Sequence, residues 1–154
     1  MMPLKIRECA EKDDAALVPL LREMLEHMAA QGGPPVNQKE DFWSSLPHPV
    51  RGPDLICFVA EIGSGLVGWV LAKIQSRADV FTPRSSLHLH AIYVRPVHRR
   101  QGIGLSLLQH ALQWGRAQGC EQADLNVLPR NEARHLYAKL GFKVFRTSMT
   151  LDLT

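Results

Sequence analysis

Two histidines separated by one residue form the most chemically informative pattern in this sequence. His88 and His90 lie in the segment 87–94, which is apolar enough to form a buried strand. On a regular strand both side chains project from one face, together with Ile92 and Val94. A neutral imidazole, with an ordinary pKa of about 6.5, can accept the proton of an ammonium group directly or through water.

Two other interpretations of this pair stay open. Both rings could be hydrogen-bonded structural histidines. A His-x-His pair on a strand could also belong to a zinc site, but no third ligand with recognisable spacing follows it. We therefore expect no metal.

A basic, glycine-containing turn and the start of a helix follow this strand. The turn consists of Arg99, Arg100, Gln101, Gly102, Ile103 and Gly104. Glycine allows backbone conformations that a side chain obstructs, so successive N–H groups can converge on a phosphate at the helix N-terminus. The same residues could serve only capping and solubility. A Rossmann fingerprint needs a third glycine where Leu107 stands, and no Walker A Gly-Lys-Ser/Thr occurs, so both nucleotide motifs are excluded.

Length and composition limit the class of protein. With 154 residues, of which 45% are hydrophobic, the chain predicts one globular domain over residues 1–154. A net charge of +3 does not require nucleic acid, and a small polyanionic cofactor accounts better for the arginines near residue 100. Three widely spaced cysteines indicate neither a disulfide framework nor a zinc site and favour the cytoplasm. The apolar runs are too short to cross a bilayer.

Hydrophobic periodicity and turn residues predict a β-rich α/β order of elements. Strands are expected at 4–7, 56–60, 67–72, 87–94, 123–127, 142–145 and 147–153. Helices are expected at the apolar stripe 17–28, within 36–54, from 103 to a stop at 119, and from 129–131 to a stop at 141. Asp13 and Asp14 offer an N-cap to the first helix. Loops are expected at the prolines 47, 49 and 53 and over 75–86.

The turn at 99–104 and a second motif together resemble the GCN5-related N-acetyltransferase (GNAT) superfamily. Arg99, Gly102 and Gly104 fit the pattern of motif A. Residues 131–142 fit motif B, with Asn-x-x-Ala, a tyrosine near the helix end, and Gly-Phe. The resemblance covers nearly the whole chain. It implies an α/β (α+β) acyl-CoA N-acyltransferase fold, in which a mixed, mostly antiparallel, splayed sheet is flanked by helices.

The same resemblance implies acetyl-CoA as the cosubstrate. The turn at 99–104 would bind its pyrophosphate, and Asn131 would hydrogen-bond the pantetheine arm. The backbone of three strand residues would pair with that arm as an added strand does: Ile92, Tyr93 and Val94. Tyr137 matches the family tyrosine near the CoA sulfur and would donate a proton to the departing thiolate. From the residues alone, Asn131 could equally be a helix cap and Tyr137 a core residue.

The Leu-His-Leu-His-Ala segment resembles the paired histidines of arylalkylamine N-acetyltransferases, and His90 also matches a position where polyamine-type relatives carry Glu. We therefore expect Tyr137, His90 and His88 to be catalytic. The implied reaction transfers acetyl to the primary amine of a small molecule or peptide by direct attack in a ternary complex. No cysteine lies in either motif, which disfavours a covalent intermediate. The alternative is a non-catalytic acyl-CoA-binding regulatory module.

The acceptor amine is expected to bind between the regions 22–54 and 75–86. Their residues combine both charge signs with aromatics and form no acidic cluster, so the acceptor stays open. Relatives commonly dimerise, often through C-terminal strands, and the alternation over 147–153 is compatible with a pairing edge. A homodimer is therefore an expectation.

Overall fold

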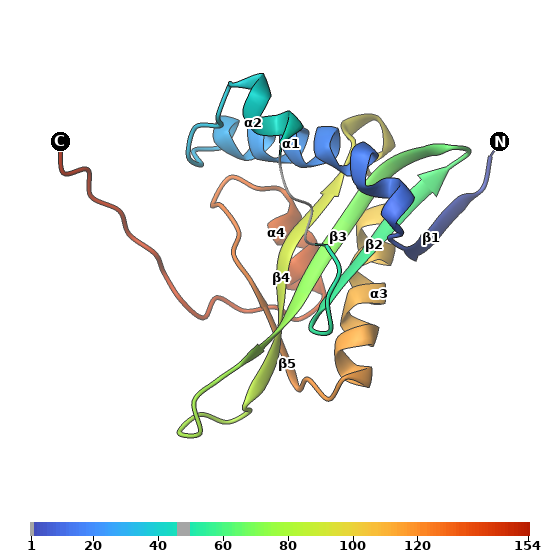
Figure 1. Ribbon diagram of the computed structural model, residues 1–154. Coiled ribbons are helices and arrows are strands. Elements are labelled where there is room, and N and C mark those ends of the chain that lie inside the picture. The colour runs from blue at the N-terminus through green and yellow to red at the C-terminus, as the bar shows by residue number, and fades with distance from the viewer. Residues whose placement is uncertain (1, 46–49) are drawn as a thin grey trace.

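The computed structural model describes residues 2–45 and 50–154, in which a single five-stranded sheet forms the centre (Figure 1). The strands are β1 (Leu4–Glu8), β2 (Leu55–Ile62), β3 (Gly65–Ser76), β4 (Ser85–Val94) and β5 (Gln122–Leu125). They lie side by side in chain order, antiparallel from β1 to β4 and parallel between β4 and β5. This confirms the expected mixed, mostly antiparallel sheet. The expected loop prolines at 47 and 49 lie outside the described residues.

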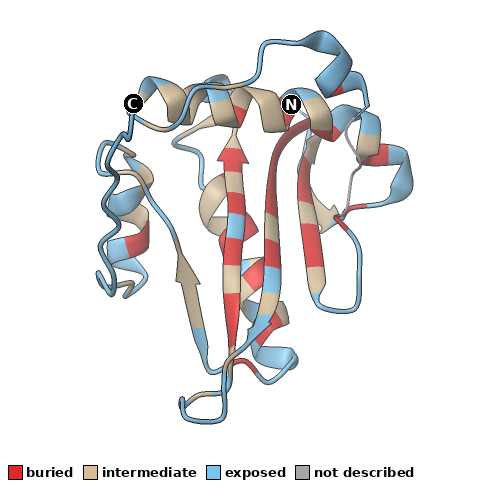
Figure 2. Ribbon diagram, turned by 60° about the vertical axis from the view of Figure 1, so that its left-hand side comes forward, coloured by how far each residue is buried: buried red, intermediate tan, exposed pale blue. Residues whose placement is uncertain are grey.

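Helices lie on both faces of the sheet (Figure 2). One face carries α1 (Asp14–Ala30), with the short α2 (Glu40–Ser44) beside it, and the other carries α3 (Ile103–Ala117) and α4 (Ala133–Lys139). Short 3-10 turns precede α1 (Glu11–Asp13) and follow β4 (Pro96–His98). Within the described residues, no helix combines the length and apolarity that crossing a membrane requires.

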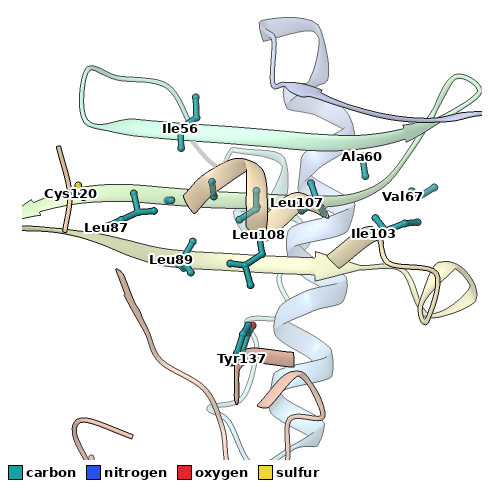
Figure 3. Close-up of a cluster of buried hydrophobic side chains, with 13 residues drawn as sticks. Ile56, Ala60, Val67, Leu87, Leu89, Ile103, Leu107, Leu108, Cys120 and Tyr137 are labelled. Carbon is teal, nitrogen blue, oxygen red and sulfur yellow. The ribbon is translucent and has the colours of Figure 1, made fainter. Parts of the chain in front are cut away.

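Each face of the sheet buries its own hydrophobic cluster. The α3 cluster contains four residues of that helix, which pack on β2, β3 and β4 (Figure 3): Ile103, Leu107, Leu108 and Ala111. The α1 cluster contains Leu17, Leu20 and Met24, which pack on the opposite face. The helical spacing of these residues puts them on one side of each helix, so both expected apolar stripes are confirmed.

Asp13 is the N-cap residue of α1, as expected, but its side chain makes no capping hydrogen bond to the helix. Its carboxylate accepts hydrogen bonds from the Arg7 guanidinium at 2.8 Å and from the Ala10 backbone N–H at 2.8 Å. Arg7 also contacts Glu61 on β2 at 2.8 Å. The guanidinium holds the pKa of Asp13 at about 2.

The chain after Gly141 forms no strand, so the two strands expected at 142–145 and 147–153 are wrong for this single chain. This tail runs away from the sheet (Figure 1). Five of its large apolar side chains are between 83% and 91% exposed: Val144, Phe145, Met149, Leu151 and Leu153. Alternating apolar residues favour extended backbone, but a strand also needs neighbouring N–H and C=O groups to pair with. The tail meets no such neighbour within the described chain.

Candidate active site

A bulge in β4 lies at the second histidine. Leu71 of β3 pairs with Ala91, whereas the next residue, Ala72, pairs with Leu89. His90 is therefore an extra residue between two paired positions, which is the definition of a β-bulge.

The bulge reverses the alternation of side chains along the rest of β4. Four β4 residues pack against the α3 cluster: Leu87, Leu89, Ile92 and Val94. Two others belong to the α1 cluster: Ala91 and Tyr93. The expectation that Ile92 and Val94 share a face with His88 and His90 is therefore wrong, because strict alternation assumes that no residue is inserted.

Strand β5 supplies a partner for the histidines that sequence analysis missed. Asp124 pairs in register with His88 across the parallel strands, and its carboxylate contacts Nδ1 of His88. The His88 ring in turn packs edge-to-face on His90, with centroids 4.6 Å apart and planes at 82°. The side chains of His88 and Asp124 are 14% and 39% exposed. The available signal was that Asp124 is the one charged residue in the predicted strand 123–127.

His90 is the more exposed of the two rings. Its pKa lies below the ordinary histidine value because of partial burial, then because of His88 and Lys73 nearby. A neutral ring at this position is therefore favoured near neutral pH. The structure thus brings Asp124, His88 and His90 together as one polar group on the sheet.

An opening between β4 and β5 begins next to this group. The parallel ladder joins only Ser86–Leu89 to Gln122–Leu125, so Ala91–Val94 extend beyond β5. The other edge of this segment stays paired with β3. Backbone groups that Ile92, Tyr93 and Val94 direct to the β5 side are thereby available to an added chain, as expected for the pantetheine arm, apart from the Val94 carbonyl, which accepts a hydrogen bond from Arg99.

The turn that leads into α3 has the backbone shape of an anion site. Arg100 and Gly102 have positive φ angles of 63° and 81°. Gly102 is the N-cap residue of α3 and provides no side-chain cap to the first N–H groups of the helix. Positive φ angles before an uncapped helix start direct backbone N–H groups toward a common point, where a phosphate can bind.

The Arg99 side chain packs against the end of β4, just before this turn. Its Nε donates to the carbonyl of Val94 at 2.8 Å, and its guanidinium carbon lies 5.3 Å from the Tyr93 ring centroid. The side chain thus connects the end of β4 to the turn. Arg100, which is exposed, adds positive charge beside it.

Tyr137 lies inside the α3 cluster, below Leu89 and Leu108 in Figure 3. Its ring packs edge-to-face on Phe142, with centroids 5.8 Å apart. Burial raises the pKa of Tyr137 to about 12. The phenol therefore keeps its proton at neutral pH.

Asn131 caps the start of α4. Its side-chain oxygen accepts the backbone N–H of Ala133 at 2.9 Å. The helix-cap interpretation of Asn131 thus has direct support, and its amide NH2 is the part that a pantetheine carbonyl could use.

The second half of α1 borders the opening. Glu23 accepts a hydrogen bond from the Tyr93 hydroxyl at 3.4 Å and lies 3.3 Å from the Arg95 guanidinium. His27 has a lowered pKa because it is partly buried and lies near Arg99. The Gln31 side-chain NH2 donates to Nε2 of His27 at 3.2 Å, and the Gln31 side-chain oxygen is buried with no hydrogen-bond partner in the described structure. A polar edge therefore connects α1 with the end of β4.

An apolar cavity of about 220 Å³ lies between α1 and α2. It is lined by Leu25, Met28, Pro34, Pro35, Val36, Asn37, Phe42 and Trp43. All of these residues belong to the region 22–54. The other region expected at the acceptor site, 75–86, contributes none of them, and the loop between β3 and β4 lies at the opposite end of the sheet from α1 and α2 (Figure 1). The segment that follows α1 also reaches the chain after β5, since a Cβ on Gly33 would lie 3.2 Å from Leu128.

The short parallel ladder between β4 and β5 and the glycine-containing start of α3 fit the acyl-CoA N-acyltransferase fold that the sequence motifs imply. The chain belongs to the acetyltransferase (GNAT) family, whose profile matches residues 20–142. It is an acetyl-CoA-dependent N-acetyltransferase, so the expected family, fold, cosubstrate and enzyme class are confirmed.

Relatives of this family are similar over most of the chain. A thialysine N-epsilon-acetyltransferase of Sus scrofa is 29% identical over 150 residues, which cover 92% of this chain and 85% of the relative. The structure of aminoglycoside N-acetyltransferase AAC(6')-Iy in complex with CoA matches with a TM-score of 0.73 at 18% identity, over 99% of this chain and 95% of that chain. A ribosomal-protein-alanine N-acetyltransferase from Brucella melitensis biovar Abortus 2308 gives 0.71 at 20% identity, over 98% and 100%. At these identities the structural matches establish the fold.

Proposed function

We propose that this enzyme acetylates the primary amine of a small molecule, and that the amine attacks the thioester directly in a ternary complex. The main observation behind this proposal is the position of the histidine pair. His88 and His90 immediately precede Ala91–Val94, the part of β4 that extends beyond β5. Amines are mostly protonated at neutral pH, so a proton acceptor beside the thioester is what the attack requires.

The chain's own groups fit acetyl-CoA along the length of the opening. The N–H groups at the turn 99–104 would hold the pyrophosphate, with Arg100, Gln101 and Ile103 around it and Arg99 bracing the turn. The backbone of Ile92–Val94 would pair with the pantetheine arm, and the Asn131 amide would meet it from the other side. When bound, acetyl-CoA supplies the activated acetyl group.

Tyr137 would supply the proton that the departing thiolate needs. Its phenol stays protonated at working pH because burial raises its pKa to about 12. The phenol would donate to the sulfur as it leaves and would regain a proton from the amine nitrogen, which must lose one after the attack. A backbone N–H of β4 would stabilise the oxyanion of the attacked carbonyl.

Cys57, the cysteine on a central strand, supports direct attack. Cys9, Cys57 and Cys120 are free and buried. The pKa of Cys57, on a central strand, is raised by its interaction with Cys9 and by burial. A thiol that resists ionisation is a poor nucleophile.

The acceptor would enter from the α1 side, between the apolar cavity and the polar edge formed by Glu23, His27 and Gln31. A small amine with an apolar body fits the cavity, and an ammonium group could donate to the unpartnered Gln31 oxygen. By their names, the relatives above act on thialysine, aminoglycosides and ribosomal-protein alanine, so thialysine and aminoglycosides are the small amines to test first and peptides are the competing class.

The decisive experiment is a thiol-release assay with acetyl-CoA and a panel of amines, with mass detection of the product. The panel contains thialysine, lysine, arylalkylamines, polyamines, aminoglycosides and peptides. Acetylation of one small-amine class at its primary amine supports the proposal and names the acceptor. Turnover on peptides alone, or CoA binding without turnover on any amine, would contradict it.

We also propose that residues 1–154 act as a single domain and that two copies associate through their tails. The exposed apolar residues after Gly141 support this, because such a segment gains stability by pairing with another chain. Sedimentation of the full chain tests it, and a monomer at micromolar concentration would refute the association.

A further inference from the structure

The contact between Asp124 and His88 has no role in holding acetyl-CoA. The carboxylate comes from β5 and the histidine from β4, at positions that the parallel register places side by side. The contact joins a carboxylate to one nitrogen of His88, and the His88 ring packs edge-to-face on His90. A carboxylate, an imidazole and a second imidazole therefore form a continuous series that starts at β5.

We propose that Asp124 is a positioning residue for the acetyl transfer proposed above: it accepts the Nδ1–H of His88, so that neutral His88 offers Nε2 as the proton acceptor of the pair. This inference rests on that proposed function. A neutral imidazole carries one N–H and one acceptor nitrogen, and the hydrogen bond made by one nitrogen decides the state of the other. An ionised carboxylate only accepts, so the nitrogen it contacts must carry the proton.

The proton step balances within this arrangement. One N–H bond of the acceptor's ammonium group breaks, and its electron pair stays on nitrogen for attack on the thioester carbonyl. The proton forms a new N–H bond at Nε2 of His88, directly or through water. The imidazolium that results lies against the Asp124 carboxylate, which stabilises its charge.

The surrounding charges favour His88 over His90 as the site of this proton. Lys73 of β3 is the register partner of His88, and it disfavours a positive charge on His90 together with His88 itself. Asp124 is the carboxylate in contact with the pair, and it contacts His88. His90 would then remain neutral and contact the acceptor from its more exposed position.

A purely structural contact would behave differently. A contact that only joins β4 to β5 would affect stability, and its loss would change kcat and KM only as far as the fold is lost. A positioning role sets which nitrogen of His88 carries the proton, so the ring tautomer and kcat must change while the protein stays folded.

The kinetic test compares Asp124→Asn with Glu121→Gln, which removes a negative charge just before β5 where no contact with the histidines exists in the structure. We expect kcat for the amine to fall at least about tenfold in Asp124→Asn, with KM for acetyl-CoA unchanged. Glu121→Gln should keep both values. An unchanged kcat in Asp124→Asn overturns the inference.

A second readout does not depend on turnover. Nitrogen-15 NMR of the histidine rings, assigned with His88→Gln, should show His88 protonated at Nδ1 in the wild type and not held in that form in Asp124→Asn. Protonation at Nε2 in the wild type overturns the inference. If the wild type acetylates an amine but either measurement gives the overturning result, only this inference fails. If the wild type acetylates no amine, the proposed function fails and this inference fails with it.

Discussion

Gly102 gives a direct test of whether the turn before α3 holds the pyrophosphate. Its φ of +81° lies in the left-handed region, and a methyl group placed there would meet no atom within 4 Å. Gly102→Ala therefore adds backbone strain without a steric clash. For an L-residue this strain is about 1–2 kcal/mol.

The strain can appear in either of two measurements. If the turn keeps its shape, the protein loses stability; if the turn relaxes, the N–H groups lose their convergence and binding weakens. We expect relaxation, because no packed atom holds residue 102 in place. Since a tenfold change in affinity corresponds to about 1.4 kcal/mol, KM for acetyl-CoA should rise by about 5- to 30-fold while kcat changes little.

Gly119 is the matched control at the other end of the same helix. It has a φ of +89°, and a methyl group at this position would also meet no atom within 4 Å. Gly119→Ala carries the same strain but lies away from the turn, so it should lower the melting temperature by about 2–4 °C per kcal/mol and leave KM for acetyl-CoA unchanged. Steady-state kinetics and thermal denaturation of both variants are the assay. A Gly102→Ala enzyme with unchanged KM, or an equal rise in Gly119→Ala, would refute the role of the turn.

Three further outcomes follow from other contacts. Tyr137→Phe should lower kcat by about 100-fold with little effect on KM for acetyl-CoA, measured by steady-state kinetics, and an unchanged kcat would remove the phenol from the reaction. The pKa of Asp13 is about 2 against an ordinary 3.8, so the stability that this carboxylate contributes is complete above pH 4 and disappears as pH falls toward 2. Arg7→Gln should remove about 2 kcal/mol of unfolding free energy at neutral pH and flatten that acid dependence, as measured by urea unfolding. An equally steep acid dependence in the variant would contradict the pairing of Arg7 with Asp13. If the full chain dimerises through its tail, as we propose, deleting 143–154 should give a folded monomer in sedimentation, and a truncated chain that still dimerises would show that the tail is not the interface.

The features that the sequence predicted are those set by local pattern. The apolar spacing of α1 and α3 is enough to place their buried sides, and the glycines at 102 and 141 adopt the positive φ angles that end or begin helices. The pairing of His88 with Asp124 was not predictable in this way, because it depends on which strand lies beside β4 and in which register. The strand prediction for the tail after Gly141 failed for a related reason. An alternating pattern describes which side chains share a face of a strand, but a strand forms only when a neighbouring strand is available to pair with it.

The bulge at His90 connects the two halves of the site. It lies directly after Leu89, the last β4 residue that pairs with β5, so the ladder ends where the extra residue enters. A bulge bends its strand and increases the local twist, which is what parts two neighbouring strands. The same residue reverses the alternation, so Ile92 and Val94 continue to pack on the α3 side after Leu87 and Leu89 have done so. One inserted residue thus lies where the β4–β5 ladder ends, next to His88, the residue that we propose as the proton acceptor, and at the edge of the opening that we propose for the cosubstrate.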